Sequence, residues 1–367
     1  MPKVSVVLPI YNSSQYLREA LDSVVNQTLN DIEIICVNDG STDNSLDIVN
    51  EYAARDKRII VINKTNSGYG HSMNKGIDAA AGEYLGILES DDFLELTMFE
   101  DLYEIAVKNN LDTVKADFYR FTKGDDGNMN LDYIKIDKDF NIGGKVYNPS
   151  ENAKDITNIL VNTWAGIYRL SFLRDHNIRH NETPGASFQD NGFFWQVQIY
   201  ANRAMLVNKP YYYCRRDNPN SSVKDATKVW AMSREFDFIR DILMRDEDVW
   251  SRFKYFYWRY KYWSYNFTES LIENKFKHDF IMRVSKEYNR ALESEELSVK
   301  VFSVREWSKI QVIIHYPEGY LKKHCQDCAA LENARNEIKL LYIRLKYVYR
   351  FRYWNIYLTK VIKKMME

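Results

Sequence analysis

The chain has 367 residues, of which 45% are hydrophobic and 28% are charged, and its formal net charge is −1. This composition is typical of a folded globular protein and excludes an intrinsically disordered chain and a globally basic nucleic-acid-binding protein. Because the length exceeds that of a usual single domain, we expect one large domain and an accessory region.

Cysteine content and hydropathy bear on where the protein resides. The cysteines are too few and too scattered for a disulfide framework, which favours a reducing cytosol: Cys36, Cys214, Cys325 and Cys328. Cys325-x-x-Cys328 lacks the second ligand pair of a zinc site, so chance spacing explains it better. The strand-like start at Val4 predicts no signal peptide, and no apolar stretch approaches the roughly 20 residues that cross a bilayer. We therefore expect a cytoplasmic protein.

Strand-like and helix-like segments alternate through the first 110 residues. Short β-branched runs predict four buried strands, at residues 4–8, 32–37, 59–62 and 83–88. Helical spacing of apolar residues predicts helices between them, ending near Asn26 and spanning residues 44–54 and 72–81. This alternation indicates parallel βαβ units, so the predicted fold class is α/β with a mostly parallel central sheet flanked by helices. A helix over 94–109, a strand over 113–121 and a surface excursion over 123–149 follow.

Three carboxylates come directly after the fourth strand, in Glu89-Ser90-Asp91-Asp92. In open α/β sheets, ligands bind beyond the carboxyl ends of the strands. Clustered carboxylates there repel one another unless a cation or a donor-rich ligand lies between them, and their hard oxygens suit Mg²⁺ or Mn²⁺ together with phosphates. The alternative is a solvated loop whose acids cap the helix that starts near Leu94.

The turn after the first strand, Pro9 to Ser14, contains no glycine. A dinucleotide-binding enzyme would show G-x-G-x-x-G here, and a P-loop is absent as well. A nucleotide must therefore be held in another way. Asp39, at the end of the second strand, can accept hydrogen bonds from a base or a ribose, and Asp91 and Asp92 can take a metal and a diphosphate. We expect these strand ends to share one crevice.

Five segments, in this order, resemble the motifs of family 2 glycosyltransferases, which are inverting enzymes of the GT-A fold that use nucleotide-diphosphate sugars. The segments are Val6-Val7-Leu8-Pro9-Ile10-Tyr11-Asn12, Val37-Asn38-Asp39-Gly40-Ser41-Thr42-Asp43, Asn66-x-Gly68, Asn74-x-Gly76 and Glu89-Ser90-Asp91-Asp92. The resemblance spans roughly residues 3 to 223. It implies a GT-A catalytic domain over residues 1–225, with a nucleotide-sugar-binding half (1–110) and an acceptor-binding half (111–225). A helical C-terminal region would occupy residues 226–367.

The resemblance also implies residues for the nucleotide-sugar site. These are Pro9 and Tyr11 at the base, Asp39 at the uracil or ribose, and Asn66, Asn74, Asp91 and Arg216 elsewhere on the donor. Asp91 and Asp92 would form the D-x-D-type pair for the ribose and the metal-bound diphosphate, with either of them able to bind the ion directly. Met73 stands where many relatives carry Arg, so that cationic contact is either missing or supplied by His71 or Lys75. The alternative for His71 is an ordinary loop histidine.

Asp190 resembles the family's catalytic aspartate, which takes the proton from the acceptor hydroxyl as its oxygen attacks the anomeric carbon. Gln189 stands at the neighbouring position usually held by Glu, next to the acceptor, and the alternative for Asp190 is a helix-capping role. Trp164 would be a stacking platform for an acceptor sugar, and the alternative is a core tryptophan.

The segment Tyr211 to Ser222 resembles a flexible loop that closes over the diphosphate. Arg216 falls at its basic position, and a guanidinium suits phosphate. Asn218 stands where His is common, so carboxylates, diphosphate oxygens and water would complete the shell of the metal.

Long helical patterns rich in aromatic and basic residues fill the C-terminal third. The last of them, over residues 338–364, suits peripheral contact with an anionic membrane surface, and the alternatives are helix packing and a homodimer interface. Nucleic acid is disfavoured by the acidic crevice.

The predicted function is an inverting glycosyltransferase dependent on Mg²⁺ or Mn²⁺. It would move a hexosyl or N-acetylhexosaminyl group from a nucleotide-diphosphate sugar, expected to be a UDP-sugar, to a glycan or lipid-linked acceptor. The reaction would serve bacterial capsule, lipopolysaccharide or exopolysaccharide synthesis at the inner face of the plasma membrane. The alternatives are a sugar nucleotidyltransferase and a non-catalytic assembly partner that retains the fold.

Overall fold

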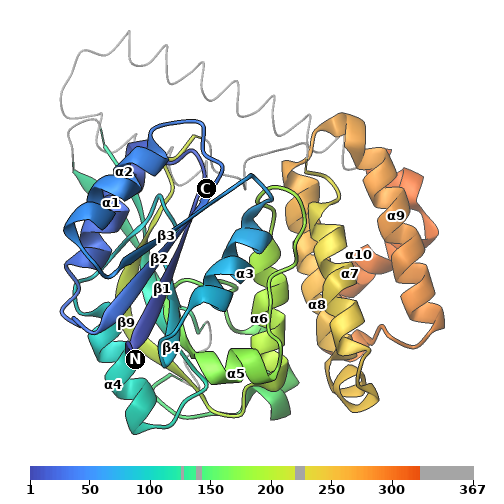
Figure 1. The fold of residues 1–367 in the computed structure, drawn as a ribbon. Coiled ribbons are helices and arrows are strands. Elements are labelled where there is room, and N and C mark those ends of the chain that lie inside the picture. Colours follow the sequence, from blue (N-terminus) through green and yellow to red (C-terminus); the bar gives the residue numbers. More distant parts are fainter. Residues whose placement is uncertain (125–127, 138–142, 220–227, 323–367) are drawn as a thin grey trace, which may run out of the picture. The chain divides into compact units, whose positions relative to one another are not determined.

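The computed structural model of the protein describes residues 1–124, 128–137, 143–219 and 228–322, and Figure 1 shows its ribbon. The chain divides into two compact units. Among the described residues, the first comprises Met1–Glu273 and Glu296–Val301, and the second comprises Asn274–Glu295 and residues 302–322. The central sheet and all the residues of the candidate site discussed below belong to the first unit.

Four parallel strands form one half of the sheet: β1 (Val4–Ile10), β2 (Ile32–Asp39), β3 (Ile59–Lys64) and β4 (Tyr84–Ile87), in the order β3-β2-β1-β4. All residues of β1 are buried, as expected for a central strand covered on both faces. Because the strands are parallel, the turns that follow β1, β2 and β4 lie at the same edge of the sheet. The βαβ pattern predicted for the first 110 residues is confirmed.

The other half of the sheet is mixed. β8 (Gly166–Arg169) pairs antiparallel with β4 and with β6 (Thr113–Lys123), and β6 pairs parallel with β9 (Ala204–Arg215). The short strands β5 (Phe93–Leu94) and β7 (Met129–Ile134) pair antiparallel with β9 and β6. The sheet is therefore parallel from β3 to β4 and mixed beyond β4.

Helices cover both faces of this sheet (Figure 1). One face carries α1 (Ser14–Val25), α2 (Ser45–Arg55) and α4 (Met98–Lys108), and the other carries α3 (Tyr69–Ala79), α5 (Leu170–Asp175) and α6 (Gln189–Tyr200). Successive side chains of a strand point to opposite faces, so β1 supplies Val6 and Leu8 to the first core and Val7 to the second. Each face is thus a separate apolar core.

The C-terminal third is helical, as predicted. α7 (Ala231–Leu243) and α8 (Glu247–Leu271) lie in the first unit, whereas α9 (Asn274–Glu293) and α10 (Val304–His315) lie in the second. The aromatic residues of α8 are used largely for packing, since Phe253, Tyr257 and Trp258 are buried. Among the described helices, none is long and apolar enough to span a membrane. The segment 338–364 and the pair Cys325 and Cys328 lie outside the described residues.

Two segments expected to be loops contain strands. The predicted surface excursion over residues 123–149 includes β7. Three short 3₁₀ turns also occur among the described residues, at Pro149–Glu151, Ala153–Thr157 and Val299–Val301. The segment beginning at Tyr211 was expected to be flexible, but Tyr211 to Arg215 continue β9 and pair with β6. A run of tyrosines is a strong strand former, and the pairing partner, about 90 residues earlier in the chain, is not visible from local sequence.

Candidate active site

A cavity of about 710 Å³ lies at the edge of the sheet where β1 and β4 end. Its wall is built from the turn after β1 with Tyr11, the turn after β4 with Glu89 and Asp91, the segment that enters α6 with Asp190, and the end of β9 with Arg216. Residues from both halves of the predicted catalytic domain therefore face the same space.

The turn after β1 is fixed to the turn after β2. Asn12 has a left-handed backbone with φ 48°, and its Oδ1 accepts a hydrogen bond from the Thr42 amide at 2.7 Å. The Ser14 amide donates to Asp43 Oδ2 at 3.0 Å, and Asp43 also accepts from the Ser45 amide. These contacts give a physical role to Asn12 and Asp43, and they hold Tyr11, which is 52% exposed, at the cavity.

Asp91 and Asp92 have different environments, although both line the cavity. Asp92 is 4% exposed, and its two oxygens accept from the Tyr212 hydroxyl at 2.9 Å and from the Arg215 amide at 2.7 Å. Burial, and next the charge of Asp91, hold the pKa of Asp92 well above its usual range. Asp91 is half-buried, and among the described residues only Asn218 donates to its carboxylate, at 2.7 Å. Asp91 is therefore the carboxylate available to a ligand.

Asp190 lies in the first turn of α6 and lines the cavity. Burial raises the pKa of Asp190 to about 6, and hydrogen bonds from its own amide and from Asn191 oppose that rise. The Asn191 side chain donates to Asp190 Oδ1 at 3.1 Å. A carboxylate whose pKa lies just below neutral is well suited to accept a proton from a hydroxyl.

Glu89 and Tyr69 also line the cavity; the sequence placed Glu89 in the carboxylate cluster but gave Tyr69 no role in the site. The Tyr69 hydroxyl donates to Glu89 Oε1 at 2.7 Å, and the Tyr69 amide donates to Gly185 O at 3.0 Å. Burial, together with the charges of Asp91 and Asp190, raises the pKa of Glu89 to about 8, and the hydrogen bond from Tyr69 opposes that rise. Glu89 thus lies within electrostatic range of both aspartates. The one signal in the sequence was its position at the head of the acidic run.

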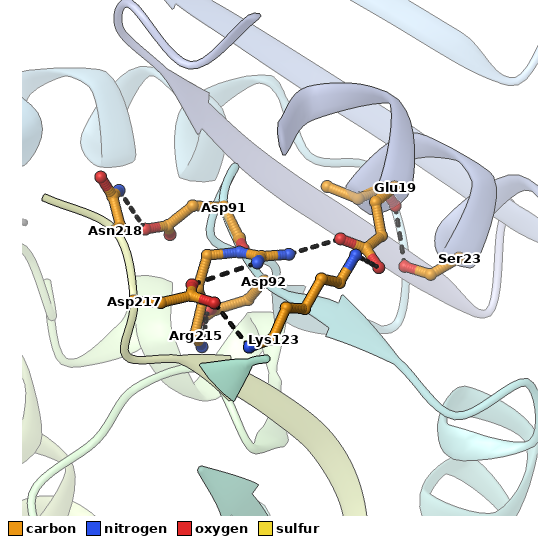
Figure 2. Close-up of polar contacts among 9 residues, drawn as sticks. Glu19, Ser23, Asp91, Asp92, Lys123, Arg215, Asp217 and Asn218 are labelled. Carbon is orange, nitrogen blue, oxygen red and sulfur yellow. Dashed lines mark hydrogen bonds and ion pairs between the residues drawn. The ribbon is translucent and has the colours of Figure 1, made fainter. Parts of the chain in front are cut away.

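Two arginines at the end of β9 have opposite surroundings. The Arg215 side chain is 2% exposed and forms ion pairs with Glu19 and with Asp217, as Figure 2 shows. Its Nε also donates to the Asp91 carbonyl at 2.8 Å, so Arg215 fixes the backbone of the acidic turn. Arg216 is exposed and lines the cavity, and no ion pair of Arg216 occurs within the described ranges. Burial and the charge of Arg216 lower the pKa of Arg120, which indicates a positive region here.

We expect Arg215→Met to lower the free energy of unfolding by roughly 3 kcal/mol, because Glu19 and Asp217 lose their shared cation and the acidic turn loses a donor. Urea denaturation measures this difference. Lys123→Met, which removes a more exposed cation from Glu19, is the matched control and should cost no more than about 0.5 kcal/mol. Equal costs for the two variants would argue against a structural role for Arg215.

Four predicted nucleotide-sugar residues are not among the described residues that line the cavity: Pro9, Asp39, Asn66 and Asn74. The Asp39 carboxylate accepts from the amides of Ser67 and Gly68, at 2.8 and 2.9 Å, and from Lys64. It therefore fixes the entry to α3. Asp91 thus lies at the cavity, whereas Asp39, at the end of β2, is not among the described residues that line it.

Asn74 also makes structural contacts. Its side chain exchanges hydrogen bonds with the backbone of His180 and donates to Glu182 Oε1 at 2.9 Å, which joins α3 to the segment that precedes α6. Neither His71 nor Lys75 lines the cavity, so the structure gives no support for a replacement of the missing arginine by either.

The two predicted acceptor residues both line the cavity. The Trp164 ring stacks on Tyr212 with centroids 4.4 Å apart and meets Phe118 edge-on, so one part of the ring is packed in the core. Gln189 is 1% exposed, and its amide donates to Thr183 Oγ1 at 2.9 Å and to Gly185 O at 3.1 Å. Gln189 therefore shapes the segment that leads to Asp190.

A metal ion would have few protein ligands. Within the described ranges, no group of three or more His, Cys, Asp or Glu side chains is arranged to hold an ion. Mg²⁺ commonly binds proteins through one or two carboxylates and completes its shell with phosphates and water. The half-buried carboxylate of Asp91 fits that mode, whereas both oxygens of the buried Asp92 already accept hydrogen bonds from the protein.

Known proteins similar to this chain are glycosyltransferases. The family model described as "Glycosyl transferase family 2" matches residues 5–175. Glycosyltransferase GlyG of Streptococcus pneumoniae is 30% identical over 237 residues, which cover 62% of this chain and 75% of the relative. The uncharacterized glycosyltransferase EpsJ of Bacillus subtilis is 33% identical over 60% of this chain and 63% of its own length. The chain thus spans less than two thirds of the length of some curated relatives.

Solved structures show the same fold. The crystal structure of S. aureus TarS 1-349 has a TM-score of 0.58 at 20% identity and covers 78% of this chain and 80% of that chain. The same fragment in complex with UDP-GlcNAc has a TM-score of 0.52 at 19% identity, over 86% and 92% of the two chains. The predicted GT-A architecture, a mixed sheet flanked by helices with a helical C-terminal region, is confirmed. The chain belongs to glycosyl transferase family 2.

Proposed function

We propose that the protein transfers a sugar, with inversion, from a nucleotide-diphosphate sugar to a hydroxyl group of an acceptor. The observation that carries this proposal is that Asp91 and Asp190, from two distant parts of the chain, line one cavity. Burial raises the pKa of Asp190 to about 6, which suits a role for that carboxylate in proton transfer.

The donor would lie against the turn after β4 and the end of β9. A volume of about 710 Å³ is within the range of pockets that hold molecules of nucleotide-sugar size. Tyr11 would cover the base, Asp91 would face the diphosphate, and Arg216 would neutralise its charge. That S. aureus TarS has been solved with UDP-GlcNAc supports a UDP-sugar as the donor.

A divalent ion, Mg²⁺ or Mn²⁺, would be held by Asp91 and the diphosphate oxygens, and it would stabilise the negative charge of the leaving group. In the chemical step, the Asp190 carboxylate accepts the proton of the acceptor hydroxyl while that oxygen forms a bond to the anomeric carbon. The bond from that carbon to the diphosphate oxygen breaks, and the nucleoside diphosphate leaves with the electron pair. Attack from the face opposite the leaving group inverts the anomeric configuration.

We infer a carbohydrate acceptor, either a glycan or a lipid-linked sugar, for which Trp164 offers an aromatic face at the cavity. Relatives named as a poly(ribitol-phosphate) beta-glucosyltransferase and a chondroitin synthase support a place in polysaccharide synthesis. We also propose that the protein resides in the cytoplasm at the inner face of the membrane, and that residues 338–364 contact the membrane surface or form a homodimer interface. The catalytic domain would end at residue 225, where the helical C-terminal region begins.

The test is a panel of nucleotide-diphosphate sugars, each incubated with and without Mn²⁺ and with saccharide or polyprenyl-linked acceptors. Release of the nucleoside diphosphate reports transfer, and the proton NMR coupling of the product's anomeric hydrogen reports inversion. Release of pyrophosphate from a nucleoside triphosphate instead would show a nucleotidyltransferase. Donor binding without turnover on any acceptor would favour an assembly partner.

Transfer should lose activity as the pH falls through about 6, because the proposed base Asp190 must be ionised and burial raises its pKa to that value. Groups that interact electrostatically with Asp190 come from several elements: Tyr69, Glu89, Tyr168, Glu235 and Tyr260. The measurement is kcat at saturating donor and acceptor from pH 4.5 to 8.5, since kcat reports ionisations of the bound complex. A flat profile across that interval would show that a proton acceptor other than Asp190 is used.

A further inference from the structure

α6, the helix that carries Asp190, begins without a side-chain cap of its own. Its N-cap residue is Phe188, which has a left-handed backbone with φ 66° and makes no capping hydrogen bond through its side chain. The amide of the fourth helical residue, Gly192, would ordinarily donate to the carbonyl of the N-cap residue, but the Phe188 carbonyl accepts from the Asn191 amide at 3.0 Å. The Gly192 amide, two residues beyond Asp190, donates to Glu235 Oε1 at 2.8 Å. The acceptor comes from another helix, α7.

The second oxygen of Glu235 holds the segment that precedes α6. Asn181 Nδ2 donates to Glu235 Oε2 at 3.0 Å, and the Glu235 side chain is 1% exposed. One buried carboxyl therefore joins the first turn of α6 to the chain that leads into it. A carboxyl group near a helix N-terminus is also favoured by the helix dipole.

Gly192 permits this close approach. A Cβ atom at residue 192 would lie 2.3 Å from Glu235 Oε1 and 2.7 Å from the Phe238 ring, so any side chain would displace α7 or the carboxyl. Glycine inside a helix costs about 1 kcal/mol relative to alanine. Its presence two residues after Asp190 is explained by the contact with α7.

We propose that Glu235 is a positioning residue for Asp190, acting through the Gly192 amide and Asn181 to fix the first turn of α6 toward the cavity. The inference rests on the proposed function, in which Asp190 is the base. Glu235 lies beyond residues 5–175, the part of the chain that the family model matches. A residue of the helical region would in this way contribute to the chemistry of the sheet domain.

The electrostatics of the pair agree with this arrangement. Burial raises the pKa of Glu235 to about 7, hydrogen bonds from Asn181 and Gly192 lower it, and the charge of Asp190 raises it. Asp190 and Glu235 therefore lie close enough for the ionisation of one to affect the other, as expected of two carboxyls at the same helix end.

The first test separates kcat from KM. Glu235→Ala should lower kcat between about tenfold and a hundredfold and leave the KM for the donor unchanged, because a small displacement of the base affects only the chemical step. Glu235→Gln keeps an acceptor for the Gly192 amide and should restore most of kcat. Asp237→Ala, on the exposed side of the same helix, should behave as the unaltered protein. If Glu235→Ala does not fold, Gly192→Ala pushes the carboxyl away and should lower kcat in the same way.

The second test does not depend on activity. In protein labelled with ¹³C at glutamate carboxyls, the signal of Glu235 is the one that Glu235→Gln removes, and Asp190→Asn should lower the pKa read from it. An unchanged pKa, or an unchanged kcat in Glu235→Ala, would overturn the inference. If the unaltered protein transfers no sugar from any donor while Asp190→Asn still shifts the Glu235 signal, the proposed function fails and the positioning contact stands.

Discussion

Asp190→Asn is expected to reduce sugar transfer by roughly 10²–10⁴-fold and to leave the affinity for the donor within about twofold. The amide has the size of the carboxylate but cannot accept the hydroxyl proton, so only the chemical step is affected. Asp190 lies in the first turn of α6, whereas the donor is proposed to contact the turn after β4 and the end of β9. Initial rates give kcat, and isothermal titration with the donor gives the affinity.

Asp78→Asn is the matched control, because it neutralises an exposed carboxylate on α3 that is paired with Arg179. Its rate and donor affinity should equal those of the unaltered protein. A loss of donor affinity in Asp190→Asn, equal to the loss of rate, would move Asp190 from proton transfer to donor recognition. Such a result would also remove the basis for a positioning role of Glu235.

The parallel half of the fold could be predicted because each of its strands is a local signal. Val4 to Leu8 and Ile32 to Val37 are short runs rich in β-branched residues with helical periodicity between them, and this alternation is typical of buried parallel strands. β5 has only two residues, and β9 pairs with β6 across about 90 residues of chain. These strands depend on tertiary contacts that no local pattern encodes.

The sequence predicted the location of residues that line the cavity better than the role of residues whose polar atoms bond to other parts of the protein. Asp91 and Asp190 are at the cavity, as the motifs indicated, but a motif does not distinguish a ligand-binding carboxylate from one that caps a turn. Asp39 illustrates this, because backbone amides and Lys64 already bond its oxygens. Glu235 had no sequence signal at all, since its partner amide at Gly192 lies 43 residues earlier.

The remaining large effect is a contrast between two adjacent aspartates. Asp91→Ala should weaken donor binding in the presence of Mn²⁺ by on the order of 100-fold, since it removes the carboxylate proposed to bind the ion of a metal-bound diphosphate. Its thermal stability should change little, because the described contacts of this carboxylate amount to one hydrogen bond from Asn218. Titration of the donor with and without Mn²⁺ measures the loss.

Asp92→Ala should instead lower the stability of the fold and leave the response to Mn²⁺ unchanged. It leaves the Arg215 amide and the Tyr212 hydroxyl buried without their acceptor, which should cost about 1–3 kcal/mol in the free energy of unfolding, while the folded protein keeps its response to Mn²⁺. The two variants differ by one position in the chain, so a shared loss of metal response would mean that Asp92 gives up its internal bonds when the ion binds. A stable Asp92→Ala variant with unchanged folding energy would contradict the internal role itself. The contrast therefore tests whether Asp91 binds the ligand while Asp92 stabilises the fold, as their hydrogen bonds indicate.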